Sequence, residues 1–524
     1  MEDVNMNIRD YVVKMGHLHP DREVLVFQEH RFTGRQVRDR IFRLSNALLG
    51  LGLEKGDRVA VLLTNSHYSV ECFYALACAG LVLVPMNSRN AAREHLYMLE
   101  NAEVRAVLVG QEFLGVIQPI LSEASGVSHA VCINGPAPQG WLDYETLIAG
   151  AGVEEPQIEL LDEDLSSIRY TSGTTGRPKG VMHSQRGALT TVYSTLMDGL
   201  DIKSTDSVAL IGPVTHASGS YILPHLVRGA KVVILPGFDV TNVLRTVEQE
   251  RVTMIHLIPT MLVMILASPE IDRYDLSSLK TIRYGASPIS PDVLKRAIGI
   301  FGDIFVQGYG LTEASMPMSL LLKDDHILDG SEKSIRRLSS IGREVTFSKV
   351  RIMDDEGNFV PPGQIGEIVV QSSQVMQGYW KNPEATAEAL RGGWLHTRDM
   401  GFMDEEGYIY LVDRKEDMII SGGFNIYPKE VEDVLYMHPA VLEAAVFGIP
   451  DEKWGETVKA AVSLKTGQKA TEQEIIEHCK THLAGYKKPT SVDFLDQLPK
   501  GHTGKIVRRE LKDPYWRGKE RKIN

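Results

Sequence analysis

Hydroxyl, glycine and cationic side chains gather in one short stretch of this chain, Tyr170 to Gly180 (YTSGTTGRPKG). Glycines let backbone N–H groups curl around an anion without Cβ clashes, and hydroxyls add further donors. The stretch is not the common P-loop, because only Thr174 and Thr175 separate its first two glycines and Pro178 precedes the lysine. The pattern predicts a phosphate-binding loop, although a flexible surface turn remains open for the loop taken alone.

Further polar motifs follow the loop in order. They are Gly285-Ala286-Ser287, Gln307-Gly308-Tyr309-Gly310-Leu311-Thr312-Glu313, Trp394-Leu395-His396-Thr397-Arg398-Asp399, Asp413-Arg414, Ser421-Gly422-Gly423-Phe424-Asn425 and Pro499-Lys500-Gly501-His502-Thr503-Gly504-Lys505. Gly285 and Gly308 each follow an apolar, strand-like run. Because open α/β sheets bind ligands at strand ends, both glycines are candidates for a binding site.

Composition limits the partners that these motifs could have. At 524 residues the chain should form at least two domains, and its 43% apolar and 24% charged residues are ordinary for a globular protein. The net charge of −12 disfavours non-specific binding to nucleic acid or to an anionic membrane. Any site for anions must therefore be formed by a local group of cations and donors and not by the overall charge.

The cysteines and the apolar runs indicate a cytoplasmic protein. The four cysteines have neither metal-ligand spacing nor the density of a disulfide framework, which fits a reducing compartment. The N-terminus lacks a signal-peptide pattern. The longest apolar run, Cys72 to Met86, is too short to span a bilayer, so we expect no transmembrane segment.

Apolar runs alternate with amphipathic ones along most of the chain. Strands are expected at 25–27, 59–63, 81–84, 106–109, 208–211, 231–235 and 254–258, and helices at 35–51, 68–79, 91–101, 240–250 and 291–301. This alternation predicts an α/β fold of mainly parallel sheets covered by helices. Residues 342–413 have shorter strands and more turns, which indicates a β-rich subdomain of a large N-terminal domain, 1–413. Residues 414–524 read as a small α+β domain, with helices at 428–437 and 472–483.

Taken together, the ordered motifs resemble the adenylate-forming superfamily, which includes fatty-acid–CoA ligases, 4-coumarate–CoA ligase, luciferase and peptide-synthetase adenylation domains. The resemblance runs from near residue 25 to near residue 512 and is strongest to acyl-CoA synthetases. It implies that a carboxylic acid reacts with ATP to give acyl-AMP and pyrophosphate. A thiol, expected to be coenzyme A, then displaces AMP after a rotation of the C-terminal domain.

The resemblance assigns the ATP-binding residues. It places Thr171, Ser172, Gly173, Thr174, Thr175, Gly176 and Lys179 around the phosphates, and Gly285, Ala286, Ser287, Gln307, Gly308 and Gly310 near adenine. Tyr309 would stack on the base, while Asp399 and Arg414 would contact the ribose. Glu313 would bind Mg²⁺, which usually takes few carboxylates together with waters and phosphate oxygens. Thr312 would lie on its phosphate side.

The resemblance also identifies Lys505 as the adenylation catalyst. A cation placed at the reacting oxygens stabilises negative charge as it shifts during transfer. Lys505 alone would read as an exposed lysine of a basic tail with Arg508 and Arg509. A mobile C-terminal domain would carry it into the site, pivoting at Glu416, where the family usually has Asp or Lys.

For coenzyme A the resemblance indicates the C-terminal domain. Gly422 and Gly423 would let the pantetheine arm pass close to backbone, with Asn425 beside it. Trp454, Tyr486 and Lys488 match positions that some CoA ligases use for the CoA nucleotide. A packed tryptophan and a solvated Tyr-Lys-Lys turn are the structural alternatives.

For the acid, His216 matches the histidine that lies near the carboxylate. Thr215 stands where the family often has an aromatic gate, and residues 217–221 lack the acid that would hold an amino-acid substrate. The expected pocket walls are Tyr221, Ile222, Tyr284, Gly308, Ser315, Met316 and Met318. They carry no charge for a second carboxylate, which favours a fatty, alicyclic or aromatic acid. Methionines adapt to several shapes, so chain length cannot be read.

Two other functions stay open at this point. The chain could load a carrier-protein thiol instead of coenzyme A, or it could be a non-catalytic ATP-binding regulator. Retention of Glu313, Asp399 and Lys505 speaks against a regulator, since binding alone needs no catalytic lysine. The expected partners are small molecules, namely the acid, ATP and CoA, and a homodimer is compatible with the sequence.

Overall fold

Two large sheets organise the N-terminal part of the protein. The computed structural model describes residues 6–171, 178–287, 289–414, 417–422, 424–501 and 506–517. The first sheet runs in the order β16 (Arg343–Glu344), β15 (Ser315–Leu321), β14 (Phe305–Leu311), β13 (Thr281–Gly285), β12 (Met254–Leu257), β10 (Ser207–Leu210), β11 (Lys231–Ile234), β1 (Glu23–Phe27) and β2 (His30–Thr33). The second runs in the order β19 (Gly378–Tyr379), β9 (Lys179–Ser184), β8 (Leu165–Thr171), β4 (Val82–Pro85), β3 (Arg58–Leu62), β5 (Val104–Gly110), β6 (His129–Ile133) and β7 (Leu142–Asp143).

Both sheets are parallel in their middle and antiparallel at edges. In the first, β1, β11, β10, β12, β13 and β14 pair in parallel, whereas β2, β15 and β16 pair antiparallel. In the second, the parallel strands end at β8, which forms an antiparallel hairpin with β9. The predicted class, an α/β fold with mainly parallel sheets, is confirmed.

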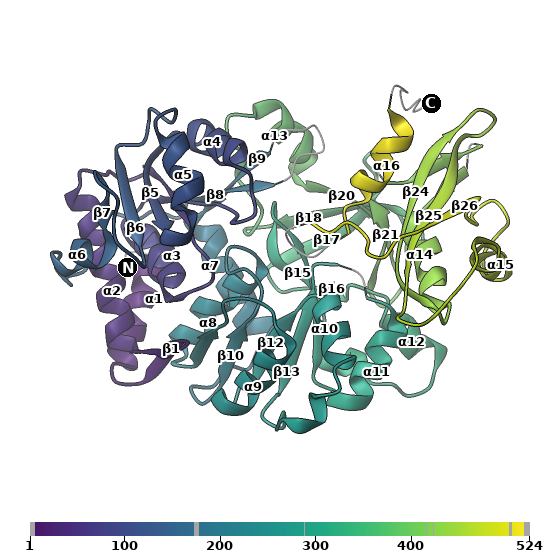
Figure 1. Ribbon diagram of the computed structural model, residues 1–524, viewed down its shortest axis with the longest axis horizontal. Helices are drawn as coiled ribbons and strands as arrows, with labels where there is room; N and C mark the ends of the chain where they lie inside the picture. Colours follow the sequence, from purple (N-terminus) through teal and green to yellow (C-terminus); the bar gives the residue numbers. More distant parts are fainter. Residues whose placement is uncertain are drawn as a thin grey trace.

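Helices fill the space between the two sheets and cover their outer faces. The inner core joins side chains of both sheets to α1 (Ile8–Leu18), α2 (Gly34–Gly50) and α3 (His67–Cys78). Outside the first sheet pack α9 (Val240–Glu250), α10 (Pro259–Leu266) and α11 (Pro291–Phe301), and outside the second pack α4 (Ala92–Asn101) and α5 (Leu114–Leu121). These layers are visible in Figure 1, where α9 and α11 lie in the lower part of the molecule. The remaining N-terminal helices are α6 (Tyr144–Ala149), α7 (Gln185–Ser194), α8 (Ile222–Val227), α12 (Glu332–Arg337) and α13 (Pro383–Ala389).

Local sequence signals explain where these helices begin and end. The Thr33 hydroxyl accepts from the Gln36 N–H while the Gln36 side chain accepts from the Thr33 N–H, a capping box that starts α2. The Asp239 carboxylate caps α9, which stops at Arg251 in the left-handed conformation. The structure confirms the helix expected at 240–250, and α2 lies one residue from its expected bounds.

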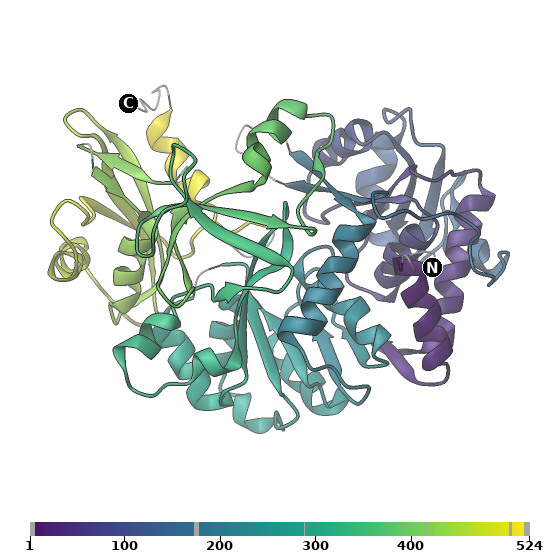
Figure 2. The same cartoon turned by 180° about the vertical axis from the view of Figure 1, so that it is seen from behind.

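A third, antiparallel sheet lies between the large sheets and the C-terminal domain. It consists of β17 (Ser348–Met353), β18 (Gly366–Ser372), β20 (Leu395–Met403) and β21 (Ile409–Arg414). Its core includes Val181 from β9 and Tyr309 from β14, so it bridges the two large sheets. The view from behind shows it in green beside the C-terminal domain (Figure 2).

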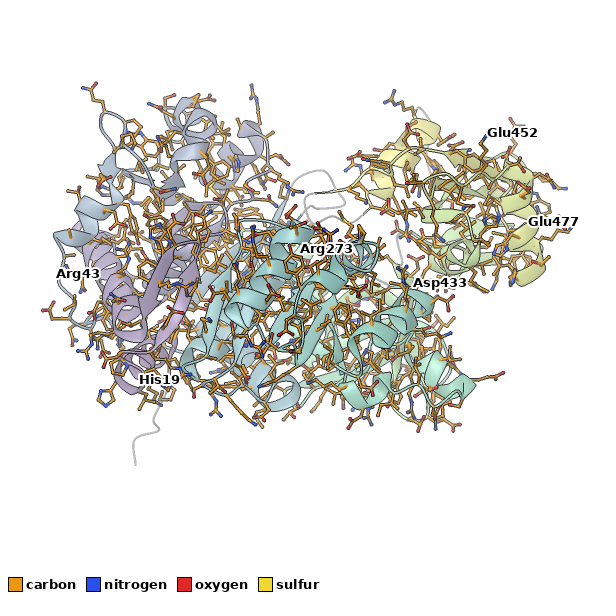
Figure 3. The ribbon with its side chains drawn as sticks, turned by 60° about the horizontal axis from the view of Figure 1, so that its bottom comes forward. His19, Arg43, Arg273, Asp433, Glu452 and Glu477 are labelled. Carbon is orange, nitrogen blue, oxygen red and sulfur yellow. The ribbon has the colours of Figure 1, made fainter. Side chains whose placement is uncertain are left out.

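The C-terminal domain has a sheet and core of its own. Strands β22 (Ile419–Ser421), β23 (Phe424–Ile426), β24 (Val441–Asp451), β25 (Gly455–Leu464) and β26 (Ser491–Phe494) pack against α14 (Pro428–Met437) and α15 (Glu472–His482). On the other side, α16 (Arg508–Trp516) adds Leu511 to a small core with Ala445 and Phe447. Figure 3 shows this domain, marked by Asp433 and Glu477, at the end opposite Arg43. Among the described helices, none is long and apolar enough to cross a membrane.

Candidate functional site

The hairpin of β8 and β9 carries the ends of the predicted phosphate loop. Thr171 and Lys179 are cross-strand partners, so the loop between them begins and ends at one point. The Lys179 ammonium lies 5.1 Å from the centre of the Tyr379 ring. Five of the predicted loop residues, Ser172, Gly173, Thr174, Thr175 and Gly176, fall outside the described residues, and their phosphate contacts remain a prediction.

Tyr379 links this hairpin to Glu313. Strand β19 pairs with β9, and the Tyr379 hydroxyl donates to Glu313 Oε1 at 3.0 Å. Burial, together with the Glu313 charge, raises the pKa of Tyr379, so the tyrosine remains a donor. Thr312 and Glu313 lie in the turn between β14 and β15, both half-buried. Sequence analysis missed Tyr379, since nothing local marks a tyrosine that becomes a partner only when β19 joins the sheet.

A single carboxylate is the protein contribution to the predicted magnesium site. No group of three metal-binding side chains occurs among the described residues. Mg²⁺ commonly keeps several waters and binds through one or two carboxylates plus substrate phosphates. Glu313, held by Tyr379 and close to the hairpin lysine, fits that donor set.

Tyr309, Asp399 and Arg414 form a second polar group. The Tyr309 hydroxyl donates to Asp399 Oδ2 at 2.6 Å, and Arg414 Nε lies 3.1 Å from Asp399 Oδ1. Strands β20 and β21 bring Asp399 and Arg414 opposite each other. Burial and the adjacent carboxylate raise the pKa of Tyr309 well above its ordinary value. Asp399 is buried whereas the Arg414 side chain is 54% exposed, so the group reaches from the core to the surface.

The glycines at the strand ends lie side by side. Gly285 and Gly308 are register partners of β13 and β14. A Cβ at Gly285 would stand 2.4 Å from the Gly308 carbonyl oxygen, so only glycine permits this approach. Ala286 is exposed just beyond the strand and Ser287 is half-exposed. Gln307 and Gly310 lie on β14 on either side of Gly308 and Tyr309.

His216 lies at the start of the turn that precedes α8. It is exposed, and its Nδ1 lies 2.8 Å from Thr215 Oγ1. Thr215, which replaces the expected aromatic gate, thus orients the imidazole that the resemblance assigns to the acid carboxylate. That assignment remains a prediction.

The expected acid pocket needs one correction. Tyr221 and Met316 belong to, or pack against, the inner core, but Tyr284 packs with Phe305 and Leu294 in the outer core and bonds to His326 at 3.0 Å. Strand residues alternate between the two faces of a sheet, so Tyr284 points away from Tyr221. The structure therefore does not join Tyr284 to the other predicted walls.

Arg283 takes the position that sequence analysis gave to Tyr284. Its guanidinium carbon lies 5.3 Å from the Tyr221 ring centre, and the side chain is 1% exposed. The acid pocket with uncharged walls remains a prediction, and Arg283 is the charged residue on the sheet face that meets Tyr221. Arg283 has the same strand parity as Gly285, but the sequence does not indicate which face of the strand meets Tyr221.

Four of the predicted CoA residues, Gly422, Trp454, Tyr486 and Lys488, lie in turns or bends of the C-terminal domain. Gly422 has φ +58°, and a Cβ there would stand 2.6 Å from the Trp454 ring, which is half-exposed. Tyr486 is 46% exposed, and its ring centre lies 4.8 Å from that of Phe424, an aromatic that sequence analysis did not assign. Lys488 follows two residues later and is half-buried.

Several predicted residues cannot be placed. Lys505, the hinge residue Glu416 and Gly423 fall outside the described residues, as does the side chain of Asn425. Arg508 follows Lys505 by three residues in sequence. It bonds to Asp417 at 3.0 Å and lies 3.5 Å from Asp413, which stand on either side of the predicted hinge residue in sequence.

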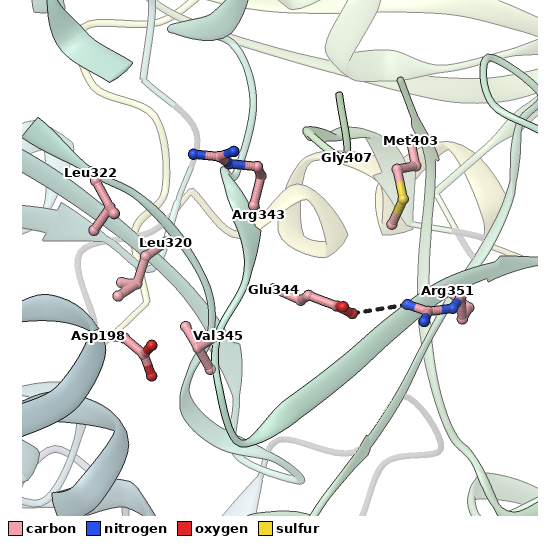
Figure 4. A pocket seen from close by; sticks show the side chains of 9 residues that line it. All are labelled: Asp198, Leu320, Leu322, Arg343, Glu344, Val345, Arg351, Met403 and Gly407. Carbon is pink, nitrogen blue, oxygen red and sulfur yellow. Dashed lines mark hydrogen bonds and ion pairs between the residues drawn. The ribbon is translucent and has the colours of Figure 1, made fainter. Parts of the chain in front are cut away.

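A cavity of about 390 Å³ lies beside the first sheet. Figure 4 shows its lining, in which Glu344 pairs with Arg351 and Asp198 faces Leu320 and Val345. None of the predicted site residues lines it.

Comparison with known families and proteins gives consistent matches over nearly the whole chain. The family model described as AMP-binding enzyme matches residues 14–380, and that described as AMP-binding enzyme C-terminal domain matches residues 430–505. A feruloyl-CoA synthase of Amycolatopsis sp is 38% identical over 510 residues, covering 97% of this chain and 99% of the relative. The medium/long-chain-fatty-acid–CoA ligase FadD8 of Mycobacterium tuberculosis is 34% identical over 529 residues, covering 97% and 91%.

Solved structures agree with the fold. The anthranilate CoA ligase AuaEII, in complex with anthranoyl-AMP, superposes with a TM-score of 0.88 at 29% identity, covering 97% of both chains. ATP-bound MatB from Rhodopseudomonas palustris superposes with a TM-score of 0.87 at 27% identity, covering 97% of this chain and 99% of the other.

Proposed function

Because the chain belongs to the AMP-binding enzyme family, and within it to the AMP-forming acid–CoA ligases, we propose that it joins a carboxylic acid to coenzyme A using ATP. The observation that carries the proposal is a pair of polar groups assembled from the predicted motifs. Lys179, Tyr379 and Glu313 form one group, and Tyr309, Asp399 and Arg414 form the other.

In the first step an oxygen of the acid carboxylate bonds to the α-phosphorus of ATP. The bond from that phosphorus to the bridging oxygen breaks, and pyrophosphate leaves with the electron pair. Asp399, already oriented by Tyr309, accepts from the ribose hydroxyls, while Arg414 limits repulsion between this carboxylate and the phosphates. Lys179 and the hairpin loop hold the leaving phosphates.

Glu313 would hold Mg²⁺, which would supply charge neutralisation as the carboxylate approaches the triphosphate. Tyr379 fixes the orientation of Glu313 by donating to Oε1. This bond uses only Oε1, so the second carboxylate oxygen of Glu313 would be the one that faces the ion.

Lys505 is proposed to place its ammonium at the attacking and bridging oxygens during this step. In the second step the thiol sulfur of CoA bonds to the acyl carbon, the bond to the AMP oxygen breaks, and the thiol proton passes to solvent. Gly422, Trp454, Phe424 and Tyr486 offer the backbone and aromatic surface for the pantetheine arm and the CoA nucleotide.

The acid is proposed to have a fatty, alicyclic or aromatic body. Apolar walls at Tyr221 and Met316 support this class. The two relatives described above act, by their names, on ferulate and on fatty acids, which supports the same range without narrowing it.

Acid-dependent release of pyrophosphate from ATP tests the proposal across a panel of these acids. We expect release with at least one acid, and AMP and an acyl-CoA thioester when CoA is added. Lys505→Ala should slow pyrophosphate release by about 10²–10³-fold while leaving the reaction of CoA with supplied acyl-adenylate largely intact. No pyrophosphate release with any acid would refute the proposal, and release that Lys505→Ala leaves unchanged would refute the role of the lysine.

A further inference from the structure

Arg283 is a fully buried cation that has no hydrogen-bond partner within the described part of the chain. Its side chain is 1% exposed, and within the described residues none of its three nitrogens has an acceptor. Its one favourable contact there is the Tyr221 ring, 5.3 Å from the guanidinium carbon. A guanidinium has five N–H donors and no acceptor, and buried charges are ordinarily paired.

The groups around Arg283 carry no negative charge. Within the described residues the buried Tyr221 hydroxyl has no partner, and burial raises its pKa, so it remains protonated. Burial, and to a smaller degree the Arg283 charge, lowers the pKa of His256 to about 3, which makes this histidine neutral. His256 Nδ1 lies 3.4 Å from Ser218 Oγ, and its Nε2 has no partner in the part of the chain that the structure describes. We call Arg283, Tyr221 and His256 the Arg283 cluster.

A carboxylate close to Arg283 in the fold, that of Asp198, is bonded to another residue. Gly199 lies directly against the guanidinium, since a Cβ on it would stand 2.7 Å from Arg283 Nη1. Its neighbour Asp198 instead bonds to Thr346, through the backbone N–H at 3.1 Å and the hydroxyl at 2.6 Å. Figure 4 shows Asp198 at the cavity on that side. Among the described residues the Arg283 guanidinium is therefore left without an acceptor, and this carboxylate bonds to Thr346 instead.

The Arg283 cluster lies next to the candidate adenylate site. A Cβ at Gly308 would stand 3.5 Å from Arg283 Nη2 and 3.6 Å from Met316 Sδ, so both side chains meet over this glycine. His256, Arg283 and Val306 are register neighbours on one face of β12, β13 and β14. An acid whose carboxylate lies at the strand ends near Gly285 would extend its body toward this face.

We propose that the Arg283 cluster binds an oxygen acceptor on the acid substrate, such as a second carboxylate or a ring oxygen, remote from the carboxylate that is adenylated. The inference rests on the proposed acyl-CoA ligase function and makes the acid bifunctional rather than purely apolar. Arg283 is then a specificity-determining residue. A site built to pair a substrate oxygen rejects the analogue without it strongly, because the buried donors are left unpaired.

Matched acids test this proposal. The pairs are terephthalate or 4-hydroxybenzoate against 4-methylbenzoate, 4-hydroxycinnamate against 4-methylcinnamate, and straight-chain dicarboxylic against monocarboxylic acids of equal carbon number. We expect the wild-type enzyme to favour the oxygen-bearing member of at least one pair by about 100-fold in kcat/KM of pyrophosphate release. Arg283→Met should reduce that ratio to near one or reverse it, by lowering the rate with the oxygen-bearing acid.

Controls separate specificity from folding. Arg296→Met removes the same kind of side chain from α11, on the outer side of the same sheet, where Arg296 bonds to the Leu266 carbonyl. It should leave the ratio unchanged. Arg283→Lys keeps the charge and should retain part of the preference, while thermal melts report whether each variant folds.

The outcomes are distinct. An active wild-type enzyme whose ratios stay the same in Arg283→Met, or that favours the methyl-bearing acid throughout, overturns this inference and leaves the ligase function standing. An equal loss with both members of a pair assigns Arg283 a structural role and also overturns it. Failure of every acid to release pyrophosphate refutes the ligase function itself.

Discussion

Arg508 in the C-terminal domain has 25% of its side chain exposed and Arg283 in the first sheet is 1% exposed, and the surroundings of the two guanidinium groups are opposite. Arg508 donates to Glu432 at 2.7 and 3.1 Å and to Asp417 at 3.0 Å, with Asp413 at 3.5 Å. Arg283 lies against the Tyr221 ring, and none of its nitrogens has an acceptor among the described residues. Carboxylates of the protein pair with the Arg508 guanidinium, whereas no acceptor among the described residues pairs with that of Arg283.

The difference separates a residue that stabilises the fold from one that is directed to a ligand. A saturated buried ion pair is strongly destabilised when one partner is removed, because the other charges remain buried. An unpaired buried charge already opposes folding, and its removal relieves that cost. The same substitution at the two sites should therefore act with opposite sign.

Arg508→Met should give the largest effect on stability. Glu432, Asp417 and Asp413 would face one another without their cation, and we expect the C-terminal domain to lose about 3–5 kcal/mol of unfolding free energy. Urea unfolding and limited proteolysis measure this. Arg509→Met is the control, since Arg509 is 67% exposed and pairs only with Asp513, and it should change stability by less than about 0.5 kcal/mol. If Arg508→Met and Arg509→Met changed stability equally, Arg508 would not be the stabilising residue that its contacts indicate, and the contrast with Arg283 would be lost.

The carboxylates around Arg508 should also make this region pH-dependent. Burial raises the pKa of Asp413 to about 6, although Arg508 opposes the shift and Glu432 adds to it. A carboxyl group with a raised pKa in the folded state contributes its full stabilisation below about pH 4 and loses it as pH rises through about 6. The unfolding free energy of the wild type minus that of Asp413→Asn should therefore fall by about 2–3 kcal/mol from about pH 4 to about pH 7. A difference that stays constant with pH would contradict the raised pKa.

Arg283→Met should be neutral or stabilising, by up to about 1–2 kcal/mol, because it replaces an unpaired buried charge with an apolar side chain of similar length. The same urea unfolding series measures it beside Arg508→Met. A loss of several kcal/mol would show that Arg283 is needed for folding, and the comparison would then fail.

Tyr221→Phe should have the smallest effect. The Tyr221 hydroxyl has no partner among the described residues, so its removal should shift the unfolding free energy by less than about 0.5 kcal/mol. Tyr309→Phe is the matched variant, since that hydroxyl donates to Asp399 at 2.6 Å and its loss should cost about 1–3 kcal/mol. Thermal melts of both variants test whether the two buried tyrosines differ as their contacts indicate.

Much of the fold followed from local patterns. Helical spacing predicted 240–250 and 428–437 with their observed bounds, and alternating apolar runs predicted the parallel sheets. Asp399, Tyr309 and Glu313 were chosen from ordered motifs, and the structure places Tyr309 beside Asp399. Lys505 and the loop 172–177 keep their roles as predictions.

Tyr284 and Arg283 show why the rest could not be predicted. The motif marked the end of β13, but the choice between two neighbouring residues depended on which face of that strand meets Tyr221. Tyr379 likewise acquires its contact to Glu313 only when β19 adds to β9. Such partners lie tens of residues apart in sequence, so no local period encodes them.

The sequence by itself determined the order of the elements and the family to which the motifs belong. These properties depend on side-chain type and on spacing along the chain, which are local. Tertiary structure alone decided which charges are paired, because pairing depends on segments brought together from distant parts of the chain. Through that packing Arg508 gains three carboxylates, while Arg283 is buried without an acceptor among the described residues, beside the candidate adenylate site.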